Sequence, residues 1–141
     1  MSNRVLVVED EPNNRQLLLY ALKNTPYEIH QAESGQEARQ CMASLDFNLA
    51  IVDVELPDVS GLEIVAALRQ QFSAMTIVVL TANYSSTILQ DACKAGANVY
   101  VCKPFEIKRF MEFLKELPTQ PSPAAEMLVL GDHLSNRFHN C

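Results

Sequence analysis

The feature that most constrains the fold is a repeated alternation of short apolar runs with helical patterns. The apolar runs lie at 4–8, 48–53, 76–80 and 98–102, and a weaker strand pattern at 27–32 has Ile29 flanked by polar residues, as in an edge strand. Each run is followed by apolar residues at helical spacing, over about 12–23, 34–45, 60–72, 85–94 and 104–117. Strands and helices that alternate through short connections form a parallel sheet with right-handed crossovers and helices on both faces. The sequence therefore predicts an α/β fold.

The C-terminal stretch differs in composition. Pro118, Pro121 and Pro123 lie among Thr, Gln, Ser and Ala, which is typical of a linker. The run from Glu126 to Leu130 is apolar enough to dock on the rest of the chain, and the residues after it are mostly polar. We expect one folded domain at 1–117, then a Pro-containing linker and C-terminal extension at 118–141.

Charge and hydropathy exclude several kinds of partner. The 141-residue chain has a formal net charge of −6, which argues against direct nucleic-acid binding, because phosphate contacts need a basic patch. No apolar run approaches membrane-spanning length, and the start at Met1 leads straight into a strand without a signal peptide. We expect a cytoplasmic protein with no membrane contact.

Polar side chains follow four of the five predicted strands. Glu9 and Asp10 follow the first strand, Asp53 ends the third, Thr81 follows the fourth and Lys103 follows the fifth. Ligands of open α/β sheets bind at the carboxyl ends of the strands, so we expect these side chains to converge. Three carboxylates in one crevice suit Mg²⁺, which also bridges to phosphoryl oxygens, and a hydroxyl and an ammonium suit the remaining oxygens.

Phosphoryl transfer to a carboxylate is the chemistry that this set favours, with Asp53 as the nucleophile at the end of the central strand. Taken one at a time, the residues have plainer explanations. Asp53 fits a turn cap, Thr81 a strand former, and Lys103 a solvated lysine. The acids after the first strand fit the N-terminus of a helix. Their expected convergence on one edge is what favours the functional interpretation.

The sequence resembles the receiver domain of two-component response regulators, the chemotaxis-regulator-like family, over about residues 4–117. The resemblance rests on separated motifs: Val7-Val8-Glu9-Asp10-Glu11, Ile51-Val52-Asp53-Val54-Glu55-Leu56-Pro57 with Gly61, Val79-Leu80-Thr81-Ala82, and Ala95-Gly96-Ala97 through Lys103-Pro104-Phe105. It implies a flavodoxin-like (βα)5 three-layer sandwich, with a parallel five-stranded sheet of order 2-1-3-4-5. Residues 1–117 would then be the receiver, or phosphoacceptor, domain.

The resemblance also implies a phosphoryl-accepting site. Asp53 would accept the group from a sensor histidine kinase or phosphotransfer protein, in a Mg²⁺-dependent reaction of two-component phosphorelay signal transduction. Asp10 and Asp53 would ligate the metal, Glu9 would act largely through water, and the Glu55 backbone carbonyl would complete the protein ligands. The domain would be a signalling switch and not an enzyme, beyond self-phosphorylation from small donors and autodephosphorylation.

The same resemblance assigns the conformational response. Thr81 would hydrogen-bond the phosphoryl group, Lys103 would pair with it, and Tyr100 would turn inward as Thr81 moves. The Lys103-Pro104 bond is expected to be cis, which proline makes accessible. The switch would control an output partner or domain, with a possible homodimer through the face of the fourth helix, fifth strand and fifth helix.

Small departures from the family pattern concern the surroundings of the site. Glu9 stands where an aspartate is also common, which leaves the metal site intact. Glu55 and Asn83 lie two residues past Asp53 and Thr81, and we predict that they tune the lifetime of the phosphoryl group, in a direction the sequence does not indicate.

Two other functions remain open at this point. Asp53-Val54-Glu55 has the Asp-x-acid form of aspartate-nucleophile phosphatases, although those enzymes usually carry it on the first strand and have a cap domain. A flavodoxin-like cofactor binder shares the fold class. Its phosphate-binding loop is Ser-, Thr- or Gly-rich, however, whereas Glu9-Asp10-Glu11 would repel a cofactor phosphate.

Overall fold

The computed structural model describes residues 3–83, 85–104, 106–115, 126–130 and 137–140. Strands and helices alternate along the chain as predicted. The elements are β1 (Arg4–Val8), α1 (Pro12–Leu22), β2 (Glu28–Ala32), α2 (Gly35–Ser44), β3 (Leu49–Asp53), α3 (Gly61–Gln71), β4 (Thr76–Thr81), α4 (Ser86–Ala95), β5 (Val99–Cys102), α5 (Ile107–Lys115), β6 (Glu126–Leu130) and β7 (Arg137–Asn140).

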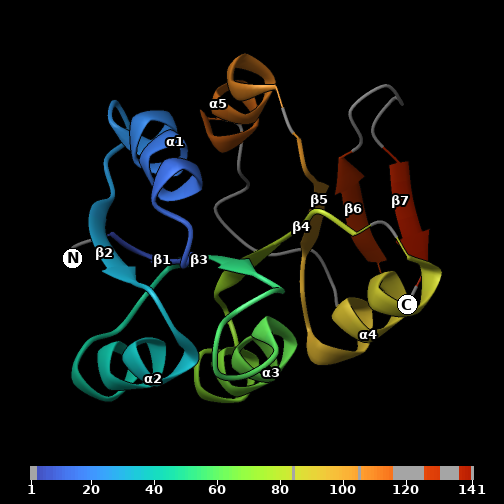
Figure 1. The fold of residues 1–141 in the computed structure, drawn as a ribbon, viewed down its shortest axis with the longest axis horizontal. Coiled ribbons are helices and arrows are strands. Elements are labelled where there is room, and N and C mark those ends of the chain that lie inside the picture. Colours follow the sequence, from blue (N-terminus) through green and yellow to red (C-terminus); the bar gives the residue numbers. More distant parts are fainter. Residues whose placement is uncertain (1–2, 84, 105, 116–125, 131–136, 141) are drawn as a thin grey trace.

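The sheet has helices on both faces. Its strand order is β2-β1-β3-β4-β5-β6-β7, and the first five strands are parallel, which confirms the predicted order 2-1-3-4-5. Figure 1 shows α1 and α5 over one face and α2, α3 and α4 over the other. The three-layer sandwich expected from the alternation of elements is therefore confirmed.

The central strands are apolar on both faces because both faces are covered. In β3, Leu49 and Ile51 pack in the cluster with the buried residues of α1 and α5. Ala50 and Val52 pack in the cluster on the side of α2, α3 and α4. The edge strand β2 is only partly buried, in agreement with its polar sequence.

Local signals place the helix ends where the sequence predicts them. Ser34 and Ser60 are the N-caps of α2 and α3, and each side-chain oxygen accepts a hydrogen bond from a main-chain NH of the first turn. Gly96 ends α4 with a φ of 109°, a left-handed conformation that favours glycine. These ends fix the loops that lead into and out of the carboxyl edge of the sheet.

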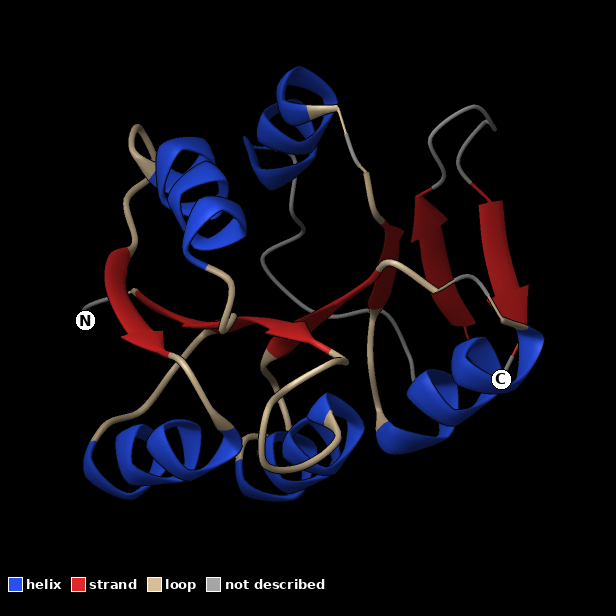
Figure 2. Ribbon diagram, in the orientation of Figure 1, coloured by secondary structure: helices blue, strands red, loops and turns tan. Residues whose placement is uncertain are grey.

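The sheet continues past β5, which corrects the predicted five-stranded sheet. β6 pairs in parallel with β5, with Tyr100 in register with Val129, and β7 pairs antiparallel with β6. Both strands lie beside β5 in Figure 2. The docking expected for 126–130 is thus pairing to the β5 edge, while strand β7 was not predicted. The linker expected to begin at Pro118 lies outside the described residues.

None of the helices in the described part of the chain has the length and apolar character needed to cross a membrane.

Candidate functional site

Asp53 lies at the carboxyl end of the central strand β3, and its exposed fraction is 2%. One carboxylate oxygen, Oδ1, accepts a hydrogen bond from the Glu55 main-chain NH at 2.9 Å. The other, Oδ2, lies 2.5 Å from the Lys103 ammonium nitrogen. The carboxylate is therefore held in place at the edge of the sheet where ligands of this fold class bind.

A close backbone approach shapes the loop after Asp53. The Gly61 NH donates to the Val54 carbonyl at 2.7 Å, which brings the start of α3 against the end of β3. A Cβ atom on Gly61 would lie 1.9 Å from the Asp53 carbonyl oxygen. Because no side chain fits there, glycine at this position lets α3 start close beneath the site.

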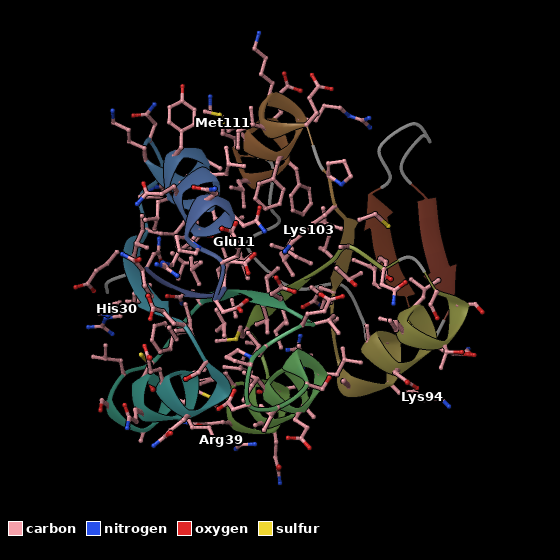
Figure 3. The ribbon with its side chains drawn as sticks, viewed as in Figure 1. Glu11, His30, Arg39, Lys94, Lys103 and Met111 are labelled. Carbon is pink, nitrogen blue, oxygen red and sulfur yellow. The ribbon has the colours of Figure 1, made fainter. Side chains whose placement is uncertain are left out.

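Lys103 joins two buried acids at the carboxyl edge of the sheet. Its ammonium nitrogen lies 2.8 Å from Glu9 Oε1 as well as 2.5 Å from Asp53 Oδ2, across 94 and 50 residues of sequence. Glu9 is fully buried at the end of β1. In Figure 3 Lys103 lies near the centre of the view, whereas Arg39 and Lys94 lie at its periphery. One lysine therefore balances part of the charge of two carboxylates.

The acids form a cluster that fits a divalent cation. Glu9, Asp10 and Asp53 each offer a carboxylate oxygen, and these oxygens lie within 4.8 Å of one another. Asp10 is exposed, so the cluster opens to solvent on its side. Hard oxygen ligands with open positions are what Mg²⁺ takes in proteins, since it keeps several waters. The residues present therefore fit Mg²⁺.

Burial and crowding separate the titration of these acids. Burial, followed by the hydrogen bond and charge of Asp53, raises the pKa of Glu9 from 4.5 to about 7. Burial alone would raise the pKa of Asp53, but hydrogen bonds with Glu9, Glu55 and Lys103 hold it below its ordinary value. Burial also works to lower the pKa of Lys103, and its two carboxylate partners raise it. Of the two buried acids, Asp53 therefore has the lowered pKa and Glu9 the raised one, and the pKa of Lys103 is raised.

Thr81 lies at the end of β4 and is fully buried. Its hydroxyl donates to Glu55 Oε1 at 2.9 Å and accepts from the Asn83 NH at 3.0 Å. The Tyr100 side chain is also fully buried, and its hydroxyl donates to the Asn83 carbonyl at 3.4 Å. Asn83 thus connects Thr81 with Tyr100, the residue that the resemblance assigns to the switch.

The structure brings most of the predicted site residues together. Glu9, Asp10, Asp53 and Lys103 form one cluster, and Thr81 is connected to it through the Glu55 carboxylate. Tyr100 itself does not line the crevice, because it packs in the core cluster on the α4 side of the sheet. The Lys103-Pro104 bond is cis, which confirms that expectation.

Two residues of the surroundings were missed by sequence reasoning. Arg15 of α1 donates to the Glu9 carbonyl at 3.0 Å and pairs with the Glu33 carboxylate at 3.0 Å, so it fixes the loop that carries the acids. Asp58 accepts from the NH groups of Gly35 and Gln36 at 2.9 and 3.0 Å, so it ties the loop after β3 to the start of α2. Neither residue has a sequence signal, because the partners are main-chain groups or distant loops.

The chain has relatives among known proteins. The family model of the response regulator receiver domain matches residues 5–115. The transcriptional regulatory protein SrrA of Staphylococcus aureus is 32% identical over 117 residues, which cover 83% of this chain and 48% of SrrA. The chain therefore spans about half the length of the curated relatives it matches.

Solved structures agree with the sequence comparison. The response regulator TrrA of Thermotoga maritima, in complex with Mg²⁺ and BeF, is 40% identical with a TM-score of 0.71, and the match covers 82% of this chain and 99% of TrrA. The chemotaxis response regulator CheY4 of Vibrio cholerae is 30% identical with a TM-score of 0.73, over 82% of this chain and 98% of CheY4. Together with the family match, they show that the chain belongs to the family of response regulator receiver domains.

Proposed function

We propose that Asp53 is the phosphoacceptor of this receiver domain. The observation that carries the proposal is the environment of its carboxylate, which is buried, has a lowered pKa, lies 2.5 Å from Lys103 and is clustered with Glu9 and Asp10. A nucleophilic carboxylate needs to be ionised and oriented, and a neighbouring cation stabilises the charge on a transferring phosphoryl group. The site provides both.

The reaction balances without a proton transfer to Asp53. A carboxylate oxygen of Asp53 forms the new bond to phosphorus, and the bond from phosphorus to the donor atom breaks with its electron pair leaving on the donor. Lys103 stays beside the acyl phosphate and pairs with one of its oxygens, and the Thr81 hydroxyl donates to another. Mg²⁺, when bound by Asp10, Asp53 and the Glu55 carbonyl with Glu9 acting through water, supplies positive charge to the phosphoryl oxygens.

The donor and the output follow from the family. We propose that a sensor histidine kinase or a phosphotransfer protein supplies the phosphoryl group in the cytoplasm. The phosphorylated domain then controls an output partner or domain through the Thr81–Asn83–Tyr100 contacts, without direct nucleic-acid binding by this domain. Residues 1–117 would form the receiver unit, with 118–141 as its linker and extension.

The proposed homodimer through α4, β5 and α5 meets an obstacle in this chain. β6 pairs with β5 from Val99 to Val101, so the β5 edge is occupied by the chain's own C-terminal strands. Deletion of 118–141 would free that edge. We expect the shortened protein to self-associate more strongly than the full chain, as followed by light scattering with and without acetyl phosphate. Equal molar masses for both proteins would contradict a role of the β5 edge in dimerisation.

Labelling tests the phosphoacceptor directly. The full chain is incubated with acetyl phosphate and Mg²⁺, and intact mass spectrometry follows the addition of phosphoryl groups. We expect one group on the wild type and on the control Asp46→Asn, none on Asp53→Asn, and none once a chelator removes Mg²⁺. Equal labelling of Asp53→Asn and wild type would overturn the assignment.

The same experiment separates a signalling domain from an enzyme. We propose that the domain has no multiple-turnover activity beyond slow loss of its own phosphoryl group. Labelling that stops at one phosphoryl group agrees with this proposal. Continuous release of phosphate from a phosphate monoester would favour an aspartate-nucleophile phosphatase instead.

The lifetime of the phosphoryl group depends on the residues that border it. We propose that Glu55 and Asn83, which both contact Thr81, tune that lifetime. Dephosphorylation of Glu55→Ala and Asn83→Ala is measured by stopped flow after the donor is removed. Wild-type rates for both variants would contradict the proposal.

A further inference from the structure

The Thr81 hydroxyl is already fully used in the unphosphorylated protein. It accepts a hydrogen bond from the Asn83 NH at 3.0 Å, and its nearest acceptor is Glu55 Oε1 at 2.9 Å, with the Asn83 carbonyl farther away at 3.3 Å. A hydroxyl carries a single hydrogen, so it donates one hydrogen bond at a time. A phosphoryl oxygen on Asp53 can only accept, and it therefore needs the same hydrogen that Glu55 now holds.

Glu55 is placed to release Thr81 when charge arrives on Asp53. Its main-chain NH donates to Asp53 Oδ1 at 2.9 Å, so the loop that carries Glu55 is attached to the phosphoacceptor. Glu55 as a residue is exposed, whereas Thr81 is fully buried, so Glu55 is the partner that can turn into solvent. A phosphoryl group adds about −1.5 to −2 of charge, which repels a neighbouring carboxylate.

We propose that the Glu55 carboxylate is a positioning group that holds Thr81 in its resting conformation, competes with the phosphoryl group for the Thr81 hydroxyl, and is displaced when Asp53 is phosphorylated. This inference rests on the proposed function, and it assigns to Glu55 a part in the conformational change that is separate from its effect on phosphoryl lifetime. The main-chain carbonyl of Glu55 keeps its proposed place as a metal ligand.

The competition has a measurable consequence for binding of a phosphoryl mimic. Beryllofluoride is titrated into the full chain by calorimetry at saturating Mg²⁺. Glu55→Ala removes the nearer, charged acceptor and leaves the Thr81 hydroxyl only the Asn83 carbonyl at 3.3 Å. We expect beryllofluoride to bind about tenfold more tightly, which is the size of effect that one hydrogen bond to a charged group has. Glu55→Gln, which keeps an acceptor oxygen but no charge, is expected to fall between Glu55→Ala and wild type.

A double-mutant cycle separates this competition from a general effect of charge. Thr81→Ala removes the hydroxyl that Glu55 holds, so Glu55→Ala is expected to give no gain in that background. The matched control Glu112→Ala removes one negative charge from the surface of α5 and is expected to bind as wild type does. A gain of equal size with and without the Thr81 hydroxyl would overturn the proposal, as would wild-type affinity for Glu55→Ala.

The failure of this inference can be told apart from the failure of the proposed function. Asp53→Asn is expected to abolish beryllofluoride binding in every background. Binding that survives Asp53→Asn would overturn the phosphoacceptor itself. Binding that is lost in Asp53→Asn but does not respond to Glu55→Ala would overturn only the competition for Thr81.

Discussion

The two ends of strands β4 and β5 each hold a partly buried cation, and they do so in opposite ways. At the amino ends, the Arg69 guanidinium donates to main-chain carbonyls on the loops around α3 and α4, those of Phe72, Ser73, Met75 and Gly96. It also donates to Asn98 Oδ1 at 2.6 Å. At the carboxyl ends, Lys103 instead faces two buried carboxylates, Glu9 and Asp53.

The difference separates a cation that ties loops together from one that belongs to a cluster of carboxylates. The partners of Arg69 are neutral and do not titrate. This cation therefore ties loops together and leaves no excess negative charge for a ligand to neutralise. The partners of Lys103 repel each other, and one lysine does not neutralise Glu9, Asp10 and Asp53 together. A proton or a divalent cation relieves that repulsion. One end of the sheet thus has a cation whose hydrogen bonds are to neutral groups, and the other has excess negative charge that fits a divalent cation.

The largest expected effect on this comparison comes from Arg69→Ala. Four main-chain carbonyls, among them that of buried Met75, and the Asn98 side chain lose their donor, which is expected to cost about 3 kcal/mol of the free energy of unfolding. Urea denaturation measures the loss. Arg39→Ala, an exposed arginine on α2, is the control and should stay close to wild type. Labelling of Asp53 in folded Arg69→Ala should remain, and its loss would show that the two ends are not independent.

Lys103→Met tests the other end. We expect the rate of labelling from acetyl phosphate to fall about 100-fold, because a charged group aimed at the phosphoryl oxygens is removed. Time courses by intact mass at fixed Mg²⁺ measure the rate. Lys108→Met removes an exposed lysine of α5 and should label as wild type does. A rate for Lys103→Met that matches this control would contradict the role of the ammonium group.

A smaller effect is expected from pH, because among the described residues only the carboxyl end has carboxylates with raised pKa values beside its cation. Glu9 has a pKa of about 7 in the folded protein against an ordinary value of 4.5, so the folded state binds its proton more tightly than the unfolded chain does. Its contribution to stability is full below pH 4.5 and is lost as the pH rises through 7. The raised pKa of Glu55 acts in the same direction.

We therefore expect the Tm of the Mg²⁺-free protein to fall by a few degrees between pH 5 and pH 8. Calorimetric scans in the presence of a chelator measure this change. The acids whose pKa is lowered, Asp53 and Asp58 among them, complete their titration below that window. Glu9→Gln should flatten the profile, and an equally steep profile in this variant would contradict the assignment to Glu9.

The smallest effect is expected from Asp58→Ala, on the β3–α3 loop at the carboxyl edge of the sheet. Asp58 accepts from the first NH groups of α2, and loss of such a cap costs about 1 kcal/mol. Urea denaturation compares it with Asp46→Ala, an exposed aspartate before β3. A loss no larger than that of the control would show that the tie between the β3–α3 loop and α2 carries no stability.

Much of the fold and of the crevice followed from local pattern. Apolar runs such as 48–53 alternate with helical spacing, and Ser34, Ser60 and Gly96 mark helix ends by their side-chain and backbone chemistry. Because parallel strands share a carboxyl edge, polar residues that follow them converge without further information. The convergence of Asp53 and Lys103 across 50 residues was therefore predictable.

Other features had no signal in the sequence because their partners are main-chain groups. Arg15 and Arg69 bind main-chain carbonyls, which every residue has. In the sequence, an arginine that fixes loops in this way therefore cannot be distinguished from an arginine on the surface of a helix. Strand β6 pairs with β5 through backbone hydrogen bonds, and a short apolar run such as 126–130 indicates docking but not its place.

What the sequence by itself determined is the layered α/β architecture, the order of its elements along the chain and the set of charged groups gathered around Asp53. These follow from periodicity and from the common edge of parallel strands. The tertiary structure decided which groups of that set contact one another and which other residues they bind. It placed the Glu55 carboxylate on the Thr81 hydroxyl and two further strands on the edge of β5. Such contacts join residues whose side chains or backbones meet only when the loops and the sheet edge have taken their positions.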